Sequence, residues 1–316
     1  GWTLALNGSN SFACTLLFTN AGVIRMDTNY ALGTSSFTVT NGGTLFGTVP
    51  LVIGNGTALR TARVTGSGSV WTNSGVLTIA SNTTITVDNG GWLIANGITM
   101  NAIGSDVENG LVISNGGQVL CTTSATYIGV SYTGANNRVS VIGGPGVVSR
   151  WNLSGQWLSI GYNGLAATNN TLLIDGRGVP GSAVVTNVGR DDAVVQGFDL
   201  GGSASAGHLI ITNGGGLFLN RNWHYVGGSF PPSAGSNNTV LVTGTGSIYS
   251  GYGTYVQGSE GCSFIVENGA VASNAYWWFR SGSSGVGNRM IVRNGGTVYG
   301  GIDYIGQGSS TENSNT

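Results

Sequence analysis

The chain has 316 residues, a formal net charge of −1 and only 7% charged residues, yet 40% of its residues are hydrophobic and 57 are glycine. This composition excludes a disordered, highly charged tail and, because strong helix formers are scarce, predicts an ordered β-rich protein. The near-zero charge with scattered arginines argues against nucleic-acid binding, and no apolar run reaches the roughly 20 residues of a membrane-spanning helix.

The N-terminal segment GWTLALNGSN carries neither an initiator Met nor the layout of a signal peptide. We therefore expect a processed or excised part of something larger. Residues 1–12 are expected to form a partial coil, with LALNG at residues 4–8 as the third strand of a coil whose earlier strands are absent.

A short strand followed by a glycine or asparagine turn recurs along the whole chain. Taking the turn residue as an anchor gives eleven copies, spaced 21 to 37 residues apart. The anchors are Asn20, Asn41, Gly66, Asn89, Asn115, Gly143, Gly176, Asn213, Gly244, Asn268 and Asn294.

The first strand of each copy shows the alternation of a strand with one buried face. The position two residues before the anchor is apolar in all eleven copies: Phe18, Val39, Val64, Val87, Ile113, Val141, Ile174, Ile211, Val242, Val266 and Val292. The position four residues before it is apolar as well: Leu16, Phe37, Ala62, Ile85, Leu111, Val139, Leu172, Leu209, Val240, Phe264 and Met290.

A second and a third strand follow each turn. In the second strand, the side chain four residues after the anchor is expected to point inward. These residues are Ile24, Leu45, Val70, Leu93, Val119, Val147, Leu217, Ile248 and Val298. The third is expected to end at Ile53, Ile103, Ile128, Ile160, Val188, Val226 and Ile305, and in variant contexts at Ile79 and Val256.

Three short strands in each coil of this length predict an all-β fold, a single-stranded parallel β-helix of about eleven coils. A propeller is the alternative, but its blades need about 40 or more residues and four antiparallel strands. Right-handedness is expected from the chirality of parallel crossovers. The whole chain, 1–316, is expected to be one solenoid domain, with a loop insertion at about 189–206 and an unfinished coil at 307–316.

An aromatic-rich stripe is expected on the outside of the second strands, five residues after the anchors. Its candidate contact residues are Phe46, Trp71, Phe218, Tyr249 and Tyr299. Alternation makes these side chains face outward, where they could mediate lateral contact between rods or bind glycan rings. The alternative is a bend in the strand that turns both neighbours inward.

The densest charged segment lies in the predicted insertion, GRDDAVVQGFDLGG at 189–202. Arg190, Asp191, Asp192 and Asp199 form a candidate loop site, because extruded loops often carry function and three acids could hold a cation. A solvated loop with a local ion pair is the competing interpretation.

Elsewhere the residues with catalytic or ligating chemistry are dispersed. Asp88, Asp175 and Glu267 are separated by coils without an acid, so they do not form the pair that glycoside hydrolysis needs. His208 and His224 are too few for a zinc site. Cys14, Cys121 and Cys262 fall in distant coils, so we expect no internal disulfide. The sequence therefore predicts no enzyme, no cofactor and no metal.

The segments VTGSGSVWTNSGVLTIA, VTGTGSIYSGYGTYVQG and SVIGGPGVVSRWNLSGQWLSIGYNG resemble the repeats of autotransporter (type V secretion) passengers and PEP-CTERM-associated bacterial surface proteins. The resemblance covers nearly the whole chain but rests on low-complexity features. It implies a β-helix at the cell surface or outside the cell, and transfers no catalytic residue. The outer-membrane barrel and the sorting tail of those proteins are not found in this sequence.

Three functions remain open. Uncovered solenoid ends offer unpaired strand edges, which favours a filament subunit or surface stalk that pairs end to end or bundles laterally; ends cut from a capped rod are the alternative. A glycan-binding adhesin would use the exposed aromatic residues. A polysaccharide lyase or hydrolase would use the 189–202 segment.

Overall fold

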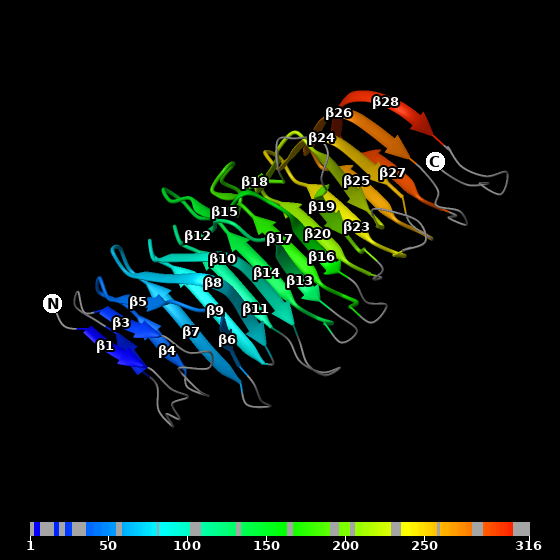
Figure 1. Ribbon diagram of the computed structural model, residues 1–316. Coiled ribbons are helices and arrows are strands. Elements are labelled where there is room, and N and C mark those ends of the chain that lie inside the picture. The colour runs from blue at the N-terminus through cyan, green and yellow to red at the C-terminus, as the bar shows by residue number, and fades with distance from the viewer. Residues whose placement is uncertain are drawn as a thin grey trace.

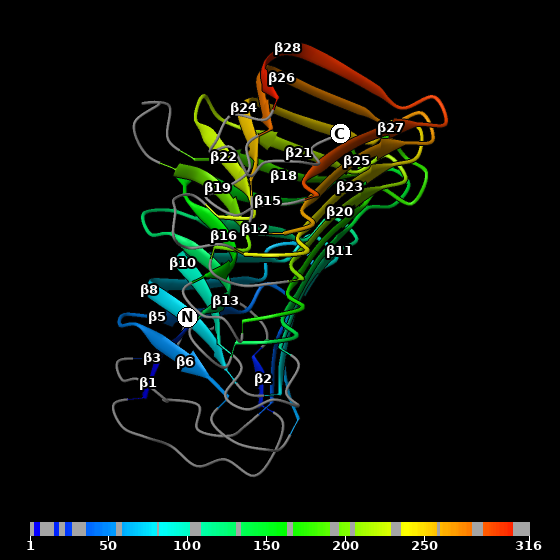
Figure 2. The same cartoon turned by 90° about the vertical axis from the view of Figure 1, so that its right-hand side faces the viewer.

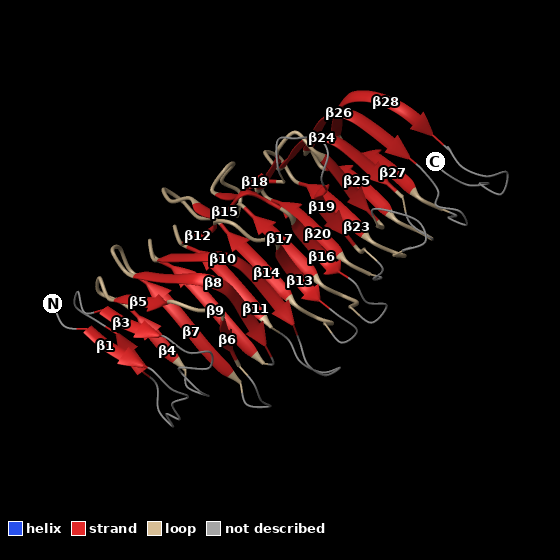
Figure 3. Ribbon diagram, viewed as in Figure 1, coloured by secondary structure: helices blue, strands red, loops and turns tan. Residues whose placement is uncertain are grey.

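The computed structural model describes residues 3–6, 16–18, 23–26, 36–54, 59–80, 82–101, 109–130, 134–162, 167–189, 196–202, 206–228, 235–257, 260–279 and 287–305. Within these ranges the regular structure is entirely β, and Figure 3 shows strands joined by loops. None of the described residues forms a helix that could cross a lipid bilayer.

Two sheets run along the molecule. The first strands of the coils form an eleven-stranded sheet: β2 (Leu16–Phe18), β4 (Phe37–Val39), β7 (Arg60–Thr65), β9 (Thr83–Asp88), β11 (Gly110–Ser114), β14 (Arg138–Ile142), β17 (Thr171–Asp175), β20 (His208–Thr212), β23 (Thr239–Thr243), β25 (Ser263–Glu267) and β27 (Arg289–Arg293).

The second and third strands form a seventeen-stranded sheet: β1 (Thr3–Leu6), β3 (Val23–Met26), β5 (Thr44–Gly47), β6 (Leu51–Ile53), β8 (Val70–Ala80), β10 (Trp92–Asn101), β12 (Gln118–Cys121), β13 (Thr126–Val130), β15 (Ser149–Gln156), β16 (Leu158–Tyr162), β18 (Ala183–Val188), β19 (Gln196–Leu200), β21 (Gly216–Leu219), β22 (Trp223–Val226), β24 (Ile248–Val256), β26 (Val271–Phe279) and β28 (Thr297–Ile305).

Each strand pairs in parallel with the equivalent strand of the next coil, as in β7 with β9, β9 with β11 and β11 with β14. Figure 1 shows the coils stacked in chain order, with the two termini at opposite ends of the rod. The predicted parallel β-helix is therefore confirmed, and the eleven-stranded sheet matches the predicted coil count. Its handedness stays a prediction.

The core lies between the two sheets, which Figure 2 shows on opposite sides of the rod. Both predicted inward columns of the first strands are buried from Phe37 to Val266, all at 0 or 1% exposure. Val64, Val87 and Ile113, for example, occupy one register position on successive strands. Burying such a side chain contributes about 1.5–3 kcal/mol, so the repeated columns are the main source of stability.

Buried asparagines also stack along the axis, just before the first strands. Asn109 Nδ2 donates to Asn137 Oδ1 at 3.0 Å, and Asn137 Nδ2 donates to Asn170 Oδ1 at 2.9 Å. These side chains satisfy backbone groups that the turns leave unpaired, because the Asn137 backbone N–H also donates to Asn170 Oδ1. At the turn anchors, by contrast, Asn89 and Asn268 donate to threonine hydroxyls of the preceding coil.

Three details of the predicted coil register are wrong. β1 pairs with β3, so residues 3–6 occupy a second-strand position rather than a third-strand one. Val188 ends the second strand of its coil, and the third strand is β19, which ends at Leu200 beside Ile160 and Val226. Residues 196–200 therefore belong to the ladder and not to the predicted insertion.

The second and third strands are not always separate. β8, β10, β24, β26 and β28 each run continuously through both positions, so β10 pairs with β12 at one end and with β13 at the other. Ile103, the segment 307–316 and most of residues 1–12 lie outside the described residues.

Candidate functional site

The predicted aromatic stripe is only partly on the surface. Tyr299 is 59% and Phe218 37% exposed, and Phe46 is half-buried. Trp71 and Tyr249 are fully buried, so the prediction that they face outward is wrong.

One additional turn residue explains the error. The turn from Asn41 places Leu45 inward, whereas the turn from Gly66 is one residue longer and aligns Trp71, not Val70, with Leu45. A shift by one residue turns every side chain of a strand to the opposite face. The same shift aligns Tyr249 with Leu217 and leaves Ile248 at the surface.

A small residue ends each turn, and its position in the sequence indicates which residue of the following strand points inward. The hydroxyls of Ser69 and Ser247 accept hydrogen bonds from Gly42 and Gly214 of the preceding coil, at 3.2 and 3.0 Å. Both serines are fully buried and lie two residues before the inward aromatic residue. Counting from this residue, rather than from the anchor, places Trp71 and Tyr249 in the core.

Inside the rod these two rings complete the packing. Trp71 meets the Phe37 ring edge to face at 5.1 Å, and Tyr249 meets Phe264 in the same way at 5.0 Å. The Tyr249 hydroxyl bonds to Thr254 Oγ1 at 2.9 Å, which satisfies its polar group. Both residues are structural and cannot contact a ligand on the surface.

The predicted loop site is not assembled in the described residues. Arg190, Asp191 and Asp192 lie outside them, while Asp199 belongs to strand β19, beside Ser159 and Tyr225. Asp199 is 1% exposed, and burial raises its pKa to about 7 although the Gly202 backbone N–H partly opposes the shift. Its Oδ1 atom has no hydrogen-bond partner among the described residues.

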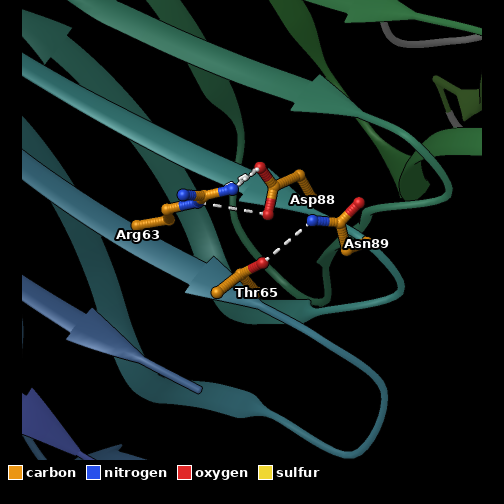
Figure 4. A network of polar contacts seen from close by, with 4 residues as sticks. All are labelled: Arg63, Thr65, Asp88 and Asn89. Carbon is orange, nitrogen blue, oxygen red and sulfur yellow. Dashed lines mark hydrogen bonds and ion pairs between the residues drawn. The ribbon is translucent and has the colours of Figure 1, made fainter. Parts of the chain in front are cut away.

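Asp88 takes part in a surface network that Figure 4 shows at close range. Arg63 Nη2 donates to Asp88 Oδ2 at 2.6 Å, and Asn89 Nδ2 donates to Thr65 Oγ1 at 3.2 Å. All four residues lie at the ends of β7 and β9, so the network ties two coils together at their turns.

A similar network occurs near the other end of the rod, where the arginine comes from the following coil rather than from the preceding one. Arg293 Nε donates to Glu267 Oε2 at 2.7 Å, and Asn268 Nδ2 donates to Thr243 Oγ1 at 3.0 Å. Recurrence in two distant coils indicates a structural device rather than an active site. Two other strands separate Asp175 on β17 from Asp88 on β9, and two separate it from Glu267 on β25.

No group of three or more metal-ligating side chains occurs in the described ranges. His208 and His224 lie in different sheets, and burial lowers the pKa of His224 to about 3. Cys121 and Cys262 are buried free thiols, which agrees for this pair with the predicted absence of disulfides, whereas Cys14 lies outside the described residues.

Sequence reasoning missed two outward aromatic groups on the third strands. The six-ring group consists of Trp223, Tyr225, Tyr252, Tyr255, Tyr276 and Trp278, all half-buried. Its members stack along the rod. The ring centroids of Tyr225 and Tyr255 lie 5.1 Å apart with an interplanar angle of 6°, and those of Trp223 and Trp278 lie 4.3 Å apart with an angle of 22°. The three-ring group consists of Tyr127, Trp157 and Tyr162, with centroids 5.0 to 5.6 Å apart.

A glycine allows the contact between Trp223 and Trp278, which spans two coils. Trp223 aligns with Gly253 of the next coil, and a side chain at Gly253 would collide with the indole ring. Trp223 therefore lies across Gly253 and reaches Trp278, two coils along. The signal in the sequence was an aromatic residue at the first and third positions of both WHYV (223–226) and YWWF (276–279).

No protein-family model and no curated protein matches this sequence. Among solved structures, a TibC-catalysed hyper-glycosylated fragment of TibA is similar to this chain, with 14% identity over 97% of each chain and a TM-score of 0.36. A likeness at this level carries no argument about function.

Proposed function

We propose that this chain forms a non-enzymatic extracellular or cell-surface rod, a filament subunit or stalk that associates end to end by strand pairing. The observation that carries the proposal is the uninterrupted parallel ladder through eleven coils. The surface is poor in charge, which permits close association of copies, and the repeat resembles those of bacterial surface proteins.

Under this proposal a second copy of the chain would pair with β27, the edge strand of the eleven-stranded sheet in the described residues. Val292 continues a column in which Val242 and Val266 are fully buried, yet it is 47% exposed itself. A further strand added to the edge of β27 would bury it and pair its backbone. A head-to-tail contact of this kind does not close into a ring and so extends into a filament.

Electron microscopy of chain 1–316 at several concentrations tests this proposal, with diffraction for an axial repeat of about 4.8 Å. We expect fibres that lengthen with concentration. Val292→Asp should shorten them, because it places a charge on the apolar end, whereas Val148→Asp alters an exposed valine on the side of the rod and should not. Short rods at every concentration would contradict end-to-end association.

A glycan-binding adhesin is the second candidate, favoured by the two outward aromatic groups. Aromatic rings with polar edges suit carbohydrate, which is apolar on its ring faces and polar at its rim. Retention of the purified chain on insoluble polysaccharides tests this candidate. Substituting Trp71 or Tyr249 would test folding instead, since both are buried.

The third hypothesis, a polysaccharide-degrading enzyme, has less support. Of the acids that could act, Asp88 and Glu267 are ion-paired with arginines, and Asp199 is buried on a strand. Asp191→Asn or Asp192→Asn would abolish any such activity if the 189–202 segment carried it.

A further inference from the structure

A hollow of about 580 Å³ lies on the outside of the rod, at the corner between the second and third strands. Among the described residues its lining combines hydroxyl, amide and glycine groups and no charged side chain, and consists of Thr122, Thr123, Ser154, Gly155, Gln156, Asn187 and Asn220. A lining of this kind offers many neutral hydrogen-bond donors and acceptors.

Four successive coils contribute to this hollow, because β12 pairs with β15, β15 with β18 and β18 with β21. Three coil spacings amount to about 14 Å, a length comparable with about three linked sugar rings. The hollow therefore suits an elongated ligand that lies along the rod axis.

Hydrogen bonds between coils fix part of the lining. Asn152 Oδ1 accepts from the Ser154 backbone N–H at 2.9 Å and from Asn187 Nδ2 at 3.0 Å. Asn220 Nδ2 donates to the Gly189 carbonyl at 2.7 Å. These contacts hold the corner before any ligand arrives, which reduces the entropy lost on binding.

The backbone at this corner is unusual as well. Of the fourteen described non-glycine residues with positive φ, eleven are asparagine, which tolerates this conformation. Ser154, at φ 49°, is one of the three that are not. A serine held in this conformation is the kind of local strain that occurs at binding sites.

The three-ring group begins where the hollow ends. Trp157 follows Gln156 directly, and its ring meets those of Tyr127 and Tyr162 edge to face. The indole Nε1–H of Trp157 is buried and has no acceptor in the described part of the chain, although buried donors normally have one. The chain therefore passes directly from the last lining residue of this coil, Gln156, to the three-ring group.

We propose that this corner is a binding site for a neutral oligosaccharide, with the polar hollow hydrogen-bonding the hydroxyl groups and Trp157 packing against a sugar ring. The proposal deepens the adhesin candidate and rests on it. Saccharide hydroxyls are matched by the amides and hydroxyls, and uronic or sialic acids are disfavoured because the described lining residues include no cation.

Isothermal titration with cellotriose, xylotriose, mannotriose and chitotriose tests the site, with trigalacturonate as the charged comparator. We expect at least one neutral trisaccharide to bind, and binding to weaken roughly tenfold in both Gln156→Ala and Trp157→Ala. Tyr299→Ala removes a more exposed ring elsewhere and should change nothing. Gln156→Ala trims a surface side chain, so it remains informative if Trp157→Ala unfolds.

Each other outcome overturns the proposal. Unchanged affinity in Gln156→Ala and Trp157→Ala would refute this site while leaving the adhesin candidate standing. Tighter binding of trigalacturonate would refute neutral selectivity. Absence of binding to every neutral trisaccharide would refute this site, whereas retention on insoluble polysaccharides would still decide the adhesin candidate and the microscopy of fibres the filament proposal.

Discussion

The buried asparagine stack should be essential to the stability of the rod, and Asn137→Ala tests this directly. Asn137 lies at the centre of the stack and is fully buried. Its Nδ2 donates to Asn170 Oδ1 at 2.9 Å and to the Gly134 carbonyl at 3.0 Å, and its Oδ1 accepts from Asn109 Nδ2 at 3.0 Å.

The magnitude follows from the groups that alanine would leave without a partner. Asn109 Nδ2 would lose its acceptor in the stack, and the Gly134 carbonyl would lose this donor, whereas Asn170 Oδ1 would keep the Asn137 backbone N–H. An unsatisfied buried polar group costs about 1–3 kcal/mol, so the two together predict a loss of about 2–6 kcal/mol.

Urea-induced unfolding followed by far-ultraviolet circular dichroism measures this loss. Asn136→Gly is the matched control: the neighbouring Asn136 has φ 57°, which glycine adopts freely, and it makes a single exposed hydrogen bond with Asn169. We expect the control to cost less than about 1 kcal/mol. If Asn137→Ala were no more destabilising than Asn136→Gly, the reasoning about the buried stack would be refuted.

Three further predictions concern core and buried groups. Trp71→Ala should destabilise the fold by about 3–5 kcal/mol, and Phe46→Ala by clearly less, in the same urea titration; equal losses would contradict the register that places only Trp71 in the core. Because the folded pKa of Asp199, about 7, lies above its ordinary value of 3.8, the folded state holds the proton more tightly and stability should fall as pH rises from about 4 to 7. Asp199→Asn should flatten this dependence, and an unchanged pH profile of unfolding would argue against it. Cys121 and Cys262 should react with iodoacetamide only after denaturation, since burial raises the pKa of both thiols; rapid labelling of the native chain, read by mass spectrometry, would disprove their burial.

The parallel β-helix itself could be predicted from the sequence because its signal is local. Residues such as Val64 and Val87 alternate with polar neighbours within a single strand, and alternation is a property of the strand alone. The signal for the turns is equally local. Asn41, Asn89 and Asn115 adopt positive φ, as expected for asparagine at a turn.

The faces of the second strands could not be fixed in this way. A single additional residue in the turn from Gly66 moves Trp71 from the predicted surface into the core, and the sequence of the strand itself does not change when that happens. Only pairing with Leu45 of the preceding coil decides which face Trp71 takes.

The candidate site depends still more on tertiary structure. Gln156, Asn187 and Asn220 come from three coils, and the stacking of those coils alone brings them to one hollow. The burial of Asp199 likewise follows from its position beside Ser159 and Tyr225, which lie 40 residues before it and 26 residues after it. The sequence by itself determined the repeat, the core columns and the turns, because these follow from local geometry. Tertiary structure decided register, burial and the site, because these depend on contacts between residues distant in the chain.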